Sequence, residues 1–324
     1  MQLGRRLTTI GVLLACGCGL AGCGGGGQTV HQPRPLNYRP GVALHANVTD
    51  IRRDGSLVVE TLSYSSVDGH RVPAVFAVPT ALEPRGCVIY QGGAGQTKEE
   101  SPGPAVWRGL GTIGLATFTI EPRETGLSQV LAALKTPETL RAFALDAVVD
   151  LRVGLDWLER QRACHHNIAY MGTSFGGVIG VLLAGQDPRI KAAVLTSIGP
   201  TFKEAMLVTA QAAKGSPDYP FVQVPGAATD PQLLARAVDI LGPYDPDKWI
   251  GRIAPRPVML IEGRFDPNVP PIDALELAAA ARDPKTVLYF NGGHEPFEPG
   301  PDLQMVLVRV AEFLARSLHL PTSF

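Results

Sequence analysis

The sequence contains few charged residues, few cysteines and no internal repeat. Only 18% of its 324 residues are charged and 45% are hydrophobic, which excludes a disordered polyelectrolyte and predicts a globular chain with a sizeable core. Twenty-nine basic residues are balanced by thirty acidic ones, so the charge gives no indication of nucleic-acid binding. The lack of a repeat from residue 42 onward, together with the length, favours one large domain.

Cysteine is scarce in the part of the chain expected to fold. Of five cysteines, only Cys87 and Cys164 lie beyond the amino-terminal leader. In an oxidising compartment this pair can form one disulfide, and two buried thiols are an equal alternative. Two cysteines offer no metal site, and we expect neither a metal nor a cofactor.

The leader carries the signals of export. Arg5 and Arg6 precede an apolar run over residues 7–20, which predicts a signal peptide over 1–22. An ordinary signal peptide or a short anchor helix are the alternatives. They are disfavoured because the leader is only just long enough to span a bilayer. Leu20-Ala21-Gly22-Cys23 resembles the bacterial lipobox, which implies a lipid on Cys23.

The predicted product is therefore an exported bacterial lipoprotein that is anchored in a membrane and faces the periplasm or the cell surface. Residues 23–41 are rich in Gly, Pro and polar residues without periodicity, and they predict a flexible tether.

From residue 42 to 324, two kinds of apolar segment alternate and predict one α/β domain. Short continuous apolar runs are typical of strands buried on both faces of a parallel sheet. Residues 137–160 and 303–318 repeat apolar side chains every three or four positions, which predicts helices that pack on the sheet. Their alternation predicts a mostly parallel sheet with helices on both faces. Asp68-Gly69, between two earlier apolar runs, predicts an antiparallel hairpin.

Residues 199–250 interrupt this alternation and predict a small helical cap inserted into the domain. Helices are expected over 202–214 and 231–241, the second with Asp230 as its N-cap and Gly242 after its end. The apolar residues of the insert either line an acyl pocket or form the insert's own core.

A nucleophile-elbow pattern occupies residues 172–176, where Ser174 stands between two glycines. An apolar strand segment precedes it and a helical run follows, which is the setting in which a serine hydroxyl is pushed into the open. Gly172 and Gly176 avoid side-chain clashes where strand and helix approach each other. Ser174 is the predicted nucleophile.

A serine nucleophile needs a base and a carboxylate that stabilises the protonated base. Asp266 follows the apolar run 258–261, and His294 follows the next run, 287–290. Because the carboxyl ends of parallel strands meet at one edge of a sheet, we expect Ser174, Asp266 and His294 to lie together there. Glu262 is the alternative acid.

The oxyanion of an acyl-transfer intermediate needs two donors. One is expected from the backbone amide of Phe175, directly after the nucleophile. The other is expected from Gly93 in the glycine-rich loop that follows the apolar run 88–90. That loop lacks the Lys and Ser/Thr of a phosphate-binding P-loop.

From about residue 48 to 318 the chain resembles the dienelactone-hydrolase, acetyl-xylan-esterase and prolyl-oligopeptidase-like branch of the α/β-hydrolases. The resemblance implies an eight-stranded core sheet and hydrolysis through an acyl-enzyme. The sequence departs from the family pattern at two positions: Gln91 stands where many relatives have the His of a His-Gly pair, and Phe175 replaces the Gln that follows the nucleophile in typical acetyl-xylan esterases. The features that carry the resemblance are Ser66-Val67-Asp68-Gly69, the elbow 172–177, Arg256-Pro257-Val258 leading into 263–266, and Gly293-His294.

These features predict a serine hydrolase that cleaves a small-molecule carboxylic ester. A serine peptidase of the prolyl-oligopeptidase-like type is the alternative, although such relatives usually carry a propeller domain, for which the segment before residue 42 is too short. A noncatalytic binding lipoprotein on the same fold is the alternative from another class.

Overall fold

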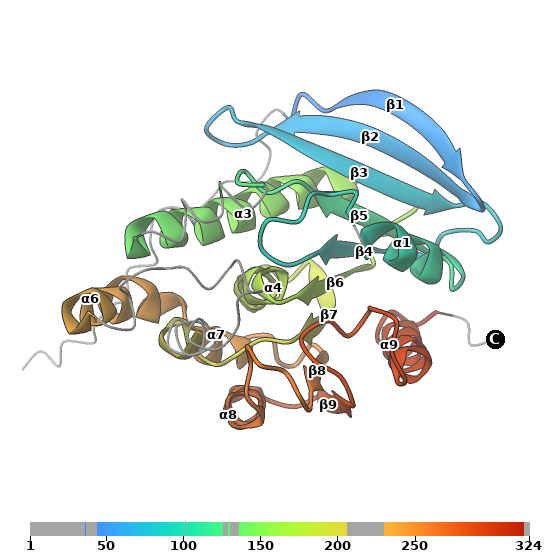
Figure 1. Ribbon diagram of the computed structural model, residues 1–324. Helices are drawn as coiled ribbons and strands as arrows, with labels where there is room; N and C mark the ends of the chain where they lie inside the picture. Colours follow the sequence, from blue (N-terminus) through green and yellow to red (C-terminus); the bar gives the residue numbers. More distant parts are fainter. Residues whose placement is uncertain are drawn as a thin grey trace, which may run out of the picture. The chain divides into compact units, whose positions relative to one another are not determined.

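A nine-stranded sheet organises the computed structural model, which describes residues 36, 44–100, 102–125, 129, 136–205 and 230–320 (Figure 1). The predicted signal peptide, Cys23 and all of the predicted tether except Leu36 lie outside the described residues. So does most of the first predicted cap helix, of which residues 202–205 are described and helical.

The sheet is mostly parallel, as the sequence predicts. Its strand order is β1-β2-β3-β5-β4-β6-β7-β8-β9, and the strands from β5 through β4 to β9 run parallel to one another. The three strands before them are antiparallel. The strands are β1 (Asn47–Asp54), β2 (Leu57–Ser65), β3 (Arg71–Pro79), β4 (Gly86–Gln91), β5 (Leu115–Ile120), β6 (Ile168–Thr173), β7 (Ile190–Thr196), β8 (Val258–Gly263) and β9 (Lys285–Phe290).

The sheet has one strand more than the eight that the family resemblance implies. The additional strand is β1, which pairs with β2 at the sheet edge. Its residues are mostly exposed, and several are charged, so it has no apolar pattern that could predict it. The predicted hairpin is present as β2 and β3, and Gly69 adopts φ +85° in the turn between them.

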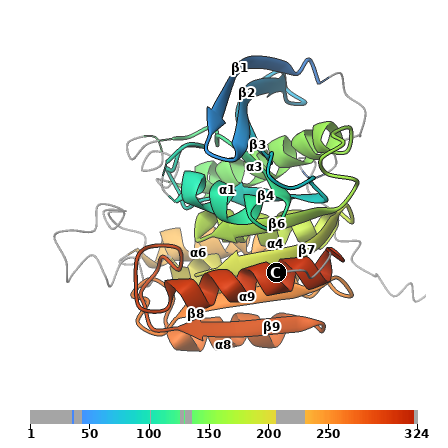
Figure 2. The ribbon, with the colours of Figure 1, turned by 90° about the vertical axis from the view of Figure 1, so that its right-hand side faces the viewer.

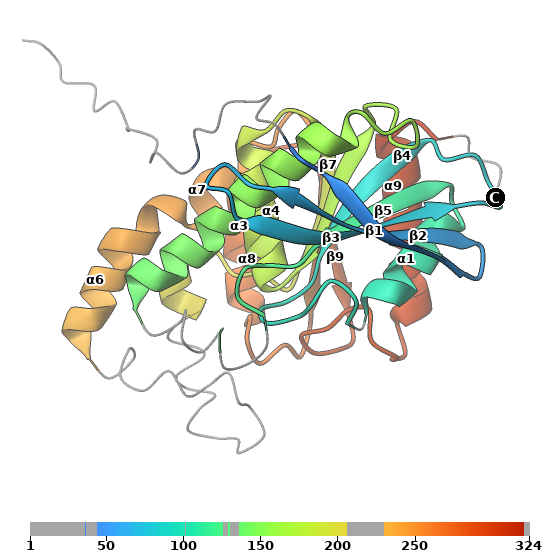
Figure 3. The same cartoon turned by 90° about the horizontal axis from the view of Figure 1, so that it is seen from above.

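Helices cover both faces of the sheet (Figures 1 and 2). Apolar residues of α1 and α9 pack on one face, and those of α3, α4, α6, α7 and α8 belong to the core on the other face. Figure 3 shows α3 and α6 side by side, and the two helices are in contact. The helices are α1 (Gly103–Gly111), α3 (Pro137–Leu158), α4 (Phe175–Gln186), α6 (Pro231–Leu241), α7 (Pro246–Ile250), α8 (Pro271–Ala280) and α9 (Leu303–Ser317).

Local signals account for where the long helices begin. Thr136 caps α3 by accepting a hydrogen bond from the amide of Thr139, and Pro137 occupies the first turn. Asp230 caps α6 in the same way through the amides of Gln232 and Leu233. Within the predicted cap, α6 packs on α3, whereas the short α7 is buried against α4 and α8. The carboxyl end of that insert is therefore part of the main core.

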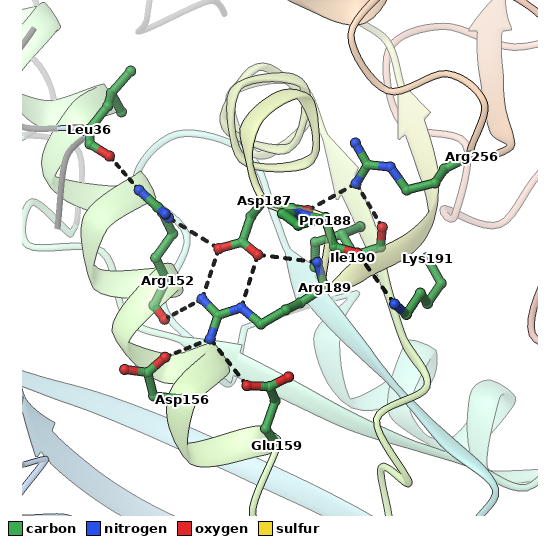
Figure 4. A network of polar contacts seen from close by, with 10 residues as sticks. All are labelled: Leu36, Arg152, Asp156, Glu159, Asp187, Pro188, Arg189, Ile190, Lys191 and Arg256. Carbon is green, nitrogen blue, oxygen red and sulfur yellow. Dashed lines mark hydrogen bonds and ion pairs between the residues drawn. The ribbon is translucent and has the colours of Figure 1, made fainter. Parts of the chain in front are cut away.

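A polar network ties α3 to the loop before β7 (Figure 4). Asp187 accepts hydrogen bonds from Arg189 and Arg152, and Arg189 also pairs with Asp156. Burial raises the pKa of Asp187, but the two guanidinium groups outweigh it and hold that pKa below its usual range. Arg152 donates in addition to the carbonyl of Leu36, which is 1% exposed. The segment predicted as a free tether is therefore attached to the domain at this residue.

Cys87 and Cys164 form a disulfide, which decides between the two alternatives that the sequence leaves open. It joins the start of β4 to the loop before β6, and both residues are fully buried. No helix within the described ranges is long and apolar enough to cross a bilayer.

Candidate active site

Ser174 occupies a sharp turn between β6 and α4, where the sequence predicts a nucleophile. Its backbone has φ 55° and ψ −122°, a conformation that residues with a Cβ rarely adopt. The amide of Ser174 donates to the carbonyl of Thr196 at 2.9 Å, and its carbonyl accepts from Val178 in the first turn of α4. Neighbouring strand and helix therefore hold the strained conformation.

The flanking glycines are required by close main-chain contacts. A Cβ on Gly172 would lie 2.5 Å from the carbonyl oxygen of Gly176. A Cβ on Gly176 would lie 2.3 Å from the carbonyl oxygen of Gln91, at the end of β4. A side chain at position 172 would push β6 away from the start of α4, and one at position 176 would push α4 away from the end of β4, which explains the two glycines of the sequence pattern.

Asp266 and His294 lie in two loops that are joined through their backbones. The amides of Arg264 and Phe265, after β8, donate to the carbonyls of Phe290, the last residue of β9, and of Gly292, both at 3.0 Å. The two loops follow neighbouring parallel strands at the carboxyl edge of the sheet, as the sequence predicts.

The side chains of Asp266 and His294 form a hydrogen-bonded pair. His294 Nδ1 lies 2.8 Å from Asp266 Oδ2. The other oxygen, Oδ1, accepts from the amides of Asn268 and Val269 at 2.7 and 3.1 Å, which fixes the carboxylate. The Asp266 side chain is fully buried and the His294 side chain is 16% exposed. The imidazole is thus oriented by one carboxylate and keeps access to solvent.

The electrostatics of this pair favour the protonated imidazole. Burial by itself lowers the pKa of His294, but the hydrogen bond to Asp266, the charge of Asp266 and the nearby Glu295 outweigh it. The pKa of His294 is therefore raised above its ordinary value of 6.5. Burial also raises the pKa of Glu295.

Glu262, the alternative acid of the sequence analysis, forms no hydrogen bond with His294 in the described part of the chain. It is the fifth residue of β8 and is 1% exposed, and neither carboxyl oxygen has a hydrogen-bond partner within the usual distance in the described part of the chain. Burial, and then the charge of Asp266, raise its pKa well above the usual range, although the Ile198 amide acts in the opposite direction. Both effects favour the protonated carboxyl, and Glu262 has no part in the hydrogen bond between Asp266 and His294.

The two predicted oxyanion donors have different surroundings. Phe175 is the first residue of α4, so its amide has no partner within the helix. Gly93 lies beside the elbow, because a Cβ there would be 3.7 Å from Ser174 Cβ. The amide of Gly93, however, donates to Gln96 Oε1 at 2.8 Å. A substrate oxygen reaches this donor only if the Gln96 side chain moves.

Three neighbours of the site were not predicted from the sequence. Gln96 is one. The ring of Phe143, on α3, stacks on the ring of Phe175 with centroids 4.5 Å apart and planes 9° from parallel. Ser197, directly after β7, donates from Oγ to the carbonyl of His294 at 2.5 Å. The signal for Ser197 in the sequence is its position directly after the apolar segment that forms β7.

Within the described residues, no group of three or more His, Cys, Asp or Glu side chains could hold a metal ion. The groups gathered at this edge are a serine hydroxyl, an imidazole paired with a carboxylate, and main-chain amides. They can transfer a proton and stabilise negative charge on oxygen.

Comparisons with known proteins agree with this fold. The family model of X-Pro dipeptidyl-peptidase (S15 family) matches residues 144–219, which include the elbow. No curated protein matches the sequence.

Among solved structures, acetyl xylan esterase from Paenibacillus sp. R4 is 18% identical with a TM-score of 0.63, over 86% of this chain and 91% of that one. Acetyl xylan esterase 1 from Thermoanaerobacterium sp. JW/SL YS485 is 16% identical with a TM-score of 0.62, over 87% and 91%. A cold-adapted esterase from an Arctic intertidal metagenomic library is 17% identical with a TM-score of 0.59, over 82% and 98%. The chain has the α/β-hydrolase fold.

Proposed function

We propose that the protein is a serine hydrolase that cleaves carboxylic esters through an acyl-enzyme. The observation that carries the proposal is the hydrogen-bonded Asp266–His294 pair at the same sheet edge as Ser174 on its strained turn. The three side chains supply a nucleophile, a base and a carboxylate that orients the base.

In the proposed reaction Ser174 Oγ attacks the acyl carbonyl. His294 Nε2 takes the hydroxyl proton, because Nδ1 is engaged by Asp266. Asp266 stabilises the imidazolium, and the amides of Phe175 and Gly93 bind the oxyanion after Gln96 has moved. The imidazolium then protonates the leaving alcohol. In the second half-reaction His294 activates water, which releases the acid and restores Ser174.

The surroundings of the site support an uncharged acyl group. The stacked rings of Phe143 and Phe175 provide an apolar surface next to the proposed Phe175 amide donor. The carboxyl of Glu295 and the charge of Asp266 act on His294, and both disfavour an anionic substrate. A small, uncharged ester is the substrate class that fits these groups best.

A first experiment tests the reaction with a fluorophosphonate probe and a series of nitrophenyl esters of increasing acyl length. We expect the wild-type protein to react with the probe and to cleave short esters, and Ser174→Ala to lose both properties by several orders of magnitude. Undiminished labelling of Ser174→Ala would contradict the assignment. A wild-type protein that the probe does not label would favour the noncatalytic alternative.

A serine peptidase is the second candidate, because the S15 family model matches the segment that contains the elbow. Paired ester and aminoacyl-amide substrates with the same acyl group distinguish the two activities. We expect the ester to react much faster. An amide rate within about tenfold of the ester rate, a barrier difference of only ~1.4 kcal/mol, would favour the peptidase.

We also propose that the protein is exported and carries a lipid on Cys23. The buried Cys87–Cys164 disulfide supports export, since such bonds persist in oxidising compartments. The full-length precursor, expressed in a bacterium, should partition into detergent and gain the mass of acyl chains at Cys23, whereas Cys23→Ala should not. Acyl chains on Cys16 instead would contradict this proposal.

A further inference from the structure

The last residue of β7 and the residue that follows it bond to the nucleophile turn, to the strand that precedes the acid and to the loop of the base. The carbonyl of Thr196 accepts the amide of Ser174 at 2.9 Å. The next residue, Ser197, donates its own amide to the carbonyl of Ile261 in β8, five residues before Asp266, at 3.0 Å. Its hydroxyl donates to the carbonyl of His294 at 2.5 Å. Two successive residues, Thr196 and Ser197, thus connect the turn of the nucleophile, the strand before the acid and the loop of the base.

Ser197 holds this place in an unfavourable backbone conformation. Its φ is 54°, in the left-handed region, and the residue is 1% exposed. A residue with a Cβ keeps such a conformation only where its surroundings impose it, and strained residues of this kind gather at functional sites. Here the bond from the Ser197 amide to Ile261 in β8, beside the bond from Ser174 to the carbonyl of Thr196, holds the main chain, and the hydroxyl Oγ meets the carbonyl of His294.

The loop before His294 is bonded to the loop of Asp266 through the carbonyl of Gly292, but that bond lies two residues before the imidazole. The loop contains Gly292 and Gly293 in succession, and glycine restricts the backbone less than any other residue. The bond from Asp266 fixes the imidazole at Nδ1, but rotation about that contact would still move Nε2. A second fixed point on the main chain removes this freedom. Ser197 Oγ supplies that point.

We propose that Ser197 is a positioning residue that fixes the main chain of His294, so that Nε2 stays aligned with the Ser174 hydroxyl. This inference rests on the proposed function of Ser174 and His294. It assigns to Ser197 no contact with substrate. Its loss should reduce the rate of the proton transfer and leave substrate binding nearly unchanged.

The test compares Ser197→Ala and Ser197→Gly with the wild-type protein. Both variants lack the hydroxyl, but glycine also relieves the strain at φ 54°. We expect both to lower kcat for a short nitrophenyl ester, and the second-order rate of fluorophosphonate labelling, by about ten- to a hundredfold, since small misplacements of a reacting group have effects of this size. KM should change by less than about threefold.

Tyr64→Phe is the matched control, because it removes a buried hydroxyl that donates to a backbone carbonyl at a distance from the site. Tyr64 Oη donates to the carbonyl of Asp150 at 2.7 Å. This variant should keep its kcat and labelling rate even where its thermal stability falls. An equal loss of kcat in the control would show that any buried hydroxyl has this effect and would overturn the proposal.

Two further outcomes would overturn the role of the Ser197 hydroxyl. One is a kcat within about twofold of wild type in both Ser197 variants. The other is a normal kcat in Ser197→Gly with a low kcat in Ser197→Ala, which would assign the effect to backbone strain. Failure of the proposed function is distinguishable, because the wild-type protein itself would then resist labelling.

Discussion

Replacing Asp266 by Asn tests how the carboxylate orients His294 while the loop that carries residue 266 keeps its shape. In the variant the side-chain oxygen can still accept from the amides of Asn268 and Val269, so the loop keeps its two bonds. The NH₂ group then faces His294 Nδ1. Since NH₂ can only donate, the imidazole must carry its proton on Nε2, where it can no longer accept the proton of Ser174.

The opposite rotamer of the asparagine is disfavoured. It would turn NH₂ toward two buried backbone amides and leave donors without acceptors, at a cost of about 1–3 kcal/mol for each unsatisfied donor. The wrong tautomer of His294 is therefore the dominant consequence. We expect kcat to fall by about 10³–10⁴-fold, a barrier increase of roughly 4–5.5 kcal/mol, with little change in the melting temperature.

The assay measures steady-state hydrolysis of a nitrophenyl ester above the pKa of His294, with Glu262→Gln as the matched control. Glu262 is buried, and burial together with the charge of Asp266 raises its pKa well above the usual range, so an amide of the same shape keeps the uncharged form that these surroundings favour. Its kcat should stay within about threefold of wild type. A larger loss in Glu262→Gln than in Asp266→Asn would refute the reasoning and assign the acid to Glu262.

Three further predictions concern other parts of the molecule. Since the base acts only when neutral and the pKa of His294 is raised, kcat/KM should rise with pH through a midpoint above 6.5. Glu295→Gln should move that midpoint to lower pH, and an unmoved midpoint would contradict the role of Glu295. Gln96→Ala frees the loop amide that Gln96 now occupies and should raise kcat/KM about two- to tenfold, whereas a fall would show that Gln96 maintains the loop. Replacing Cys87 and Cys164 together by Ala should lower the free energy of unfolding by roughly 4.5 kcal/mol in urea titrations, as chain entropy gives for a separation of 77 residues; a loss below about 1 kcal/mol contradicts that reasoning.

The loops of Ser174, Asp266 and His294 could be placed at one sheet edge because each follows an apolar segment that forms a parallel strand. The order of Ser174, Asp266 and His294 along the chain, with the periodicity of the segments between them, was enough to place their loops at one edge. Asp266 and His294 are in fact hydrogen-bonded. Such predictions need only local sequence and the rule that parallel strands end on the same side.

Contacts that depend on three-dimensional packing could not be predicted. The bond from Ser197 to His294 joins residues 97 positions apart, and nothing in the local sequence of either residue indicates it. Gln96 reaches Gly93 across a turn whose shape is set by neighbouring strands. The edge strand β1 is formed by backbone pairing of exposed, charged residues. Leu36 is buried although its surroundings in sequence are typical of a tether.

Close main-chain contacts at the glycines of the site hold the reacting groups in place, whereas neighbouring side chains determine which substrate fits. Gly176 meets the carbonyl of Gln91, and a Cβ on Gly263 would lie 2.0 Å from the carbonyl oxygen of Gly293. The main chain of the nucleophile turn thus lies directly against that of β4, and the main chain of β8 lies directly against that of the loop before His294. Substitutions of the surrounding side chains, such as the ring of Phe143, can alter which acyl group fits and leave these main-chain contacts in place. In directed evolution of this protein, new substrates should arise from changes in such peripheral side chains, whereas alanine at either glycine should abolish every activity together.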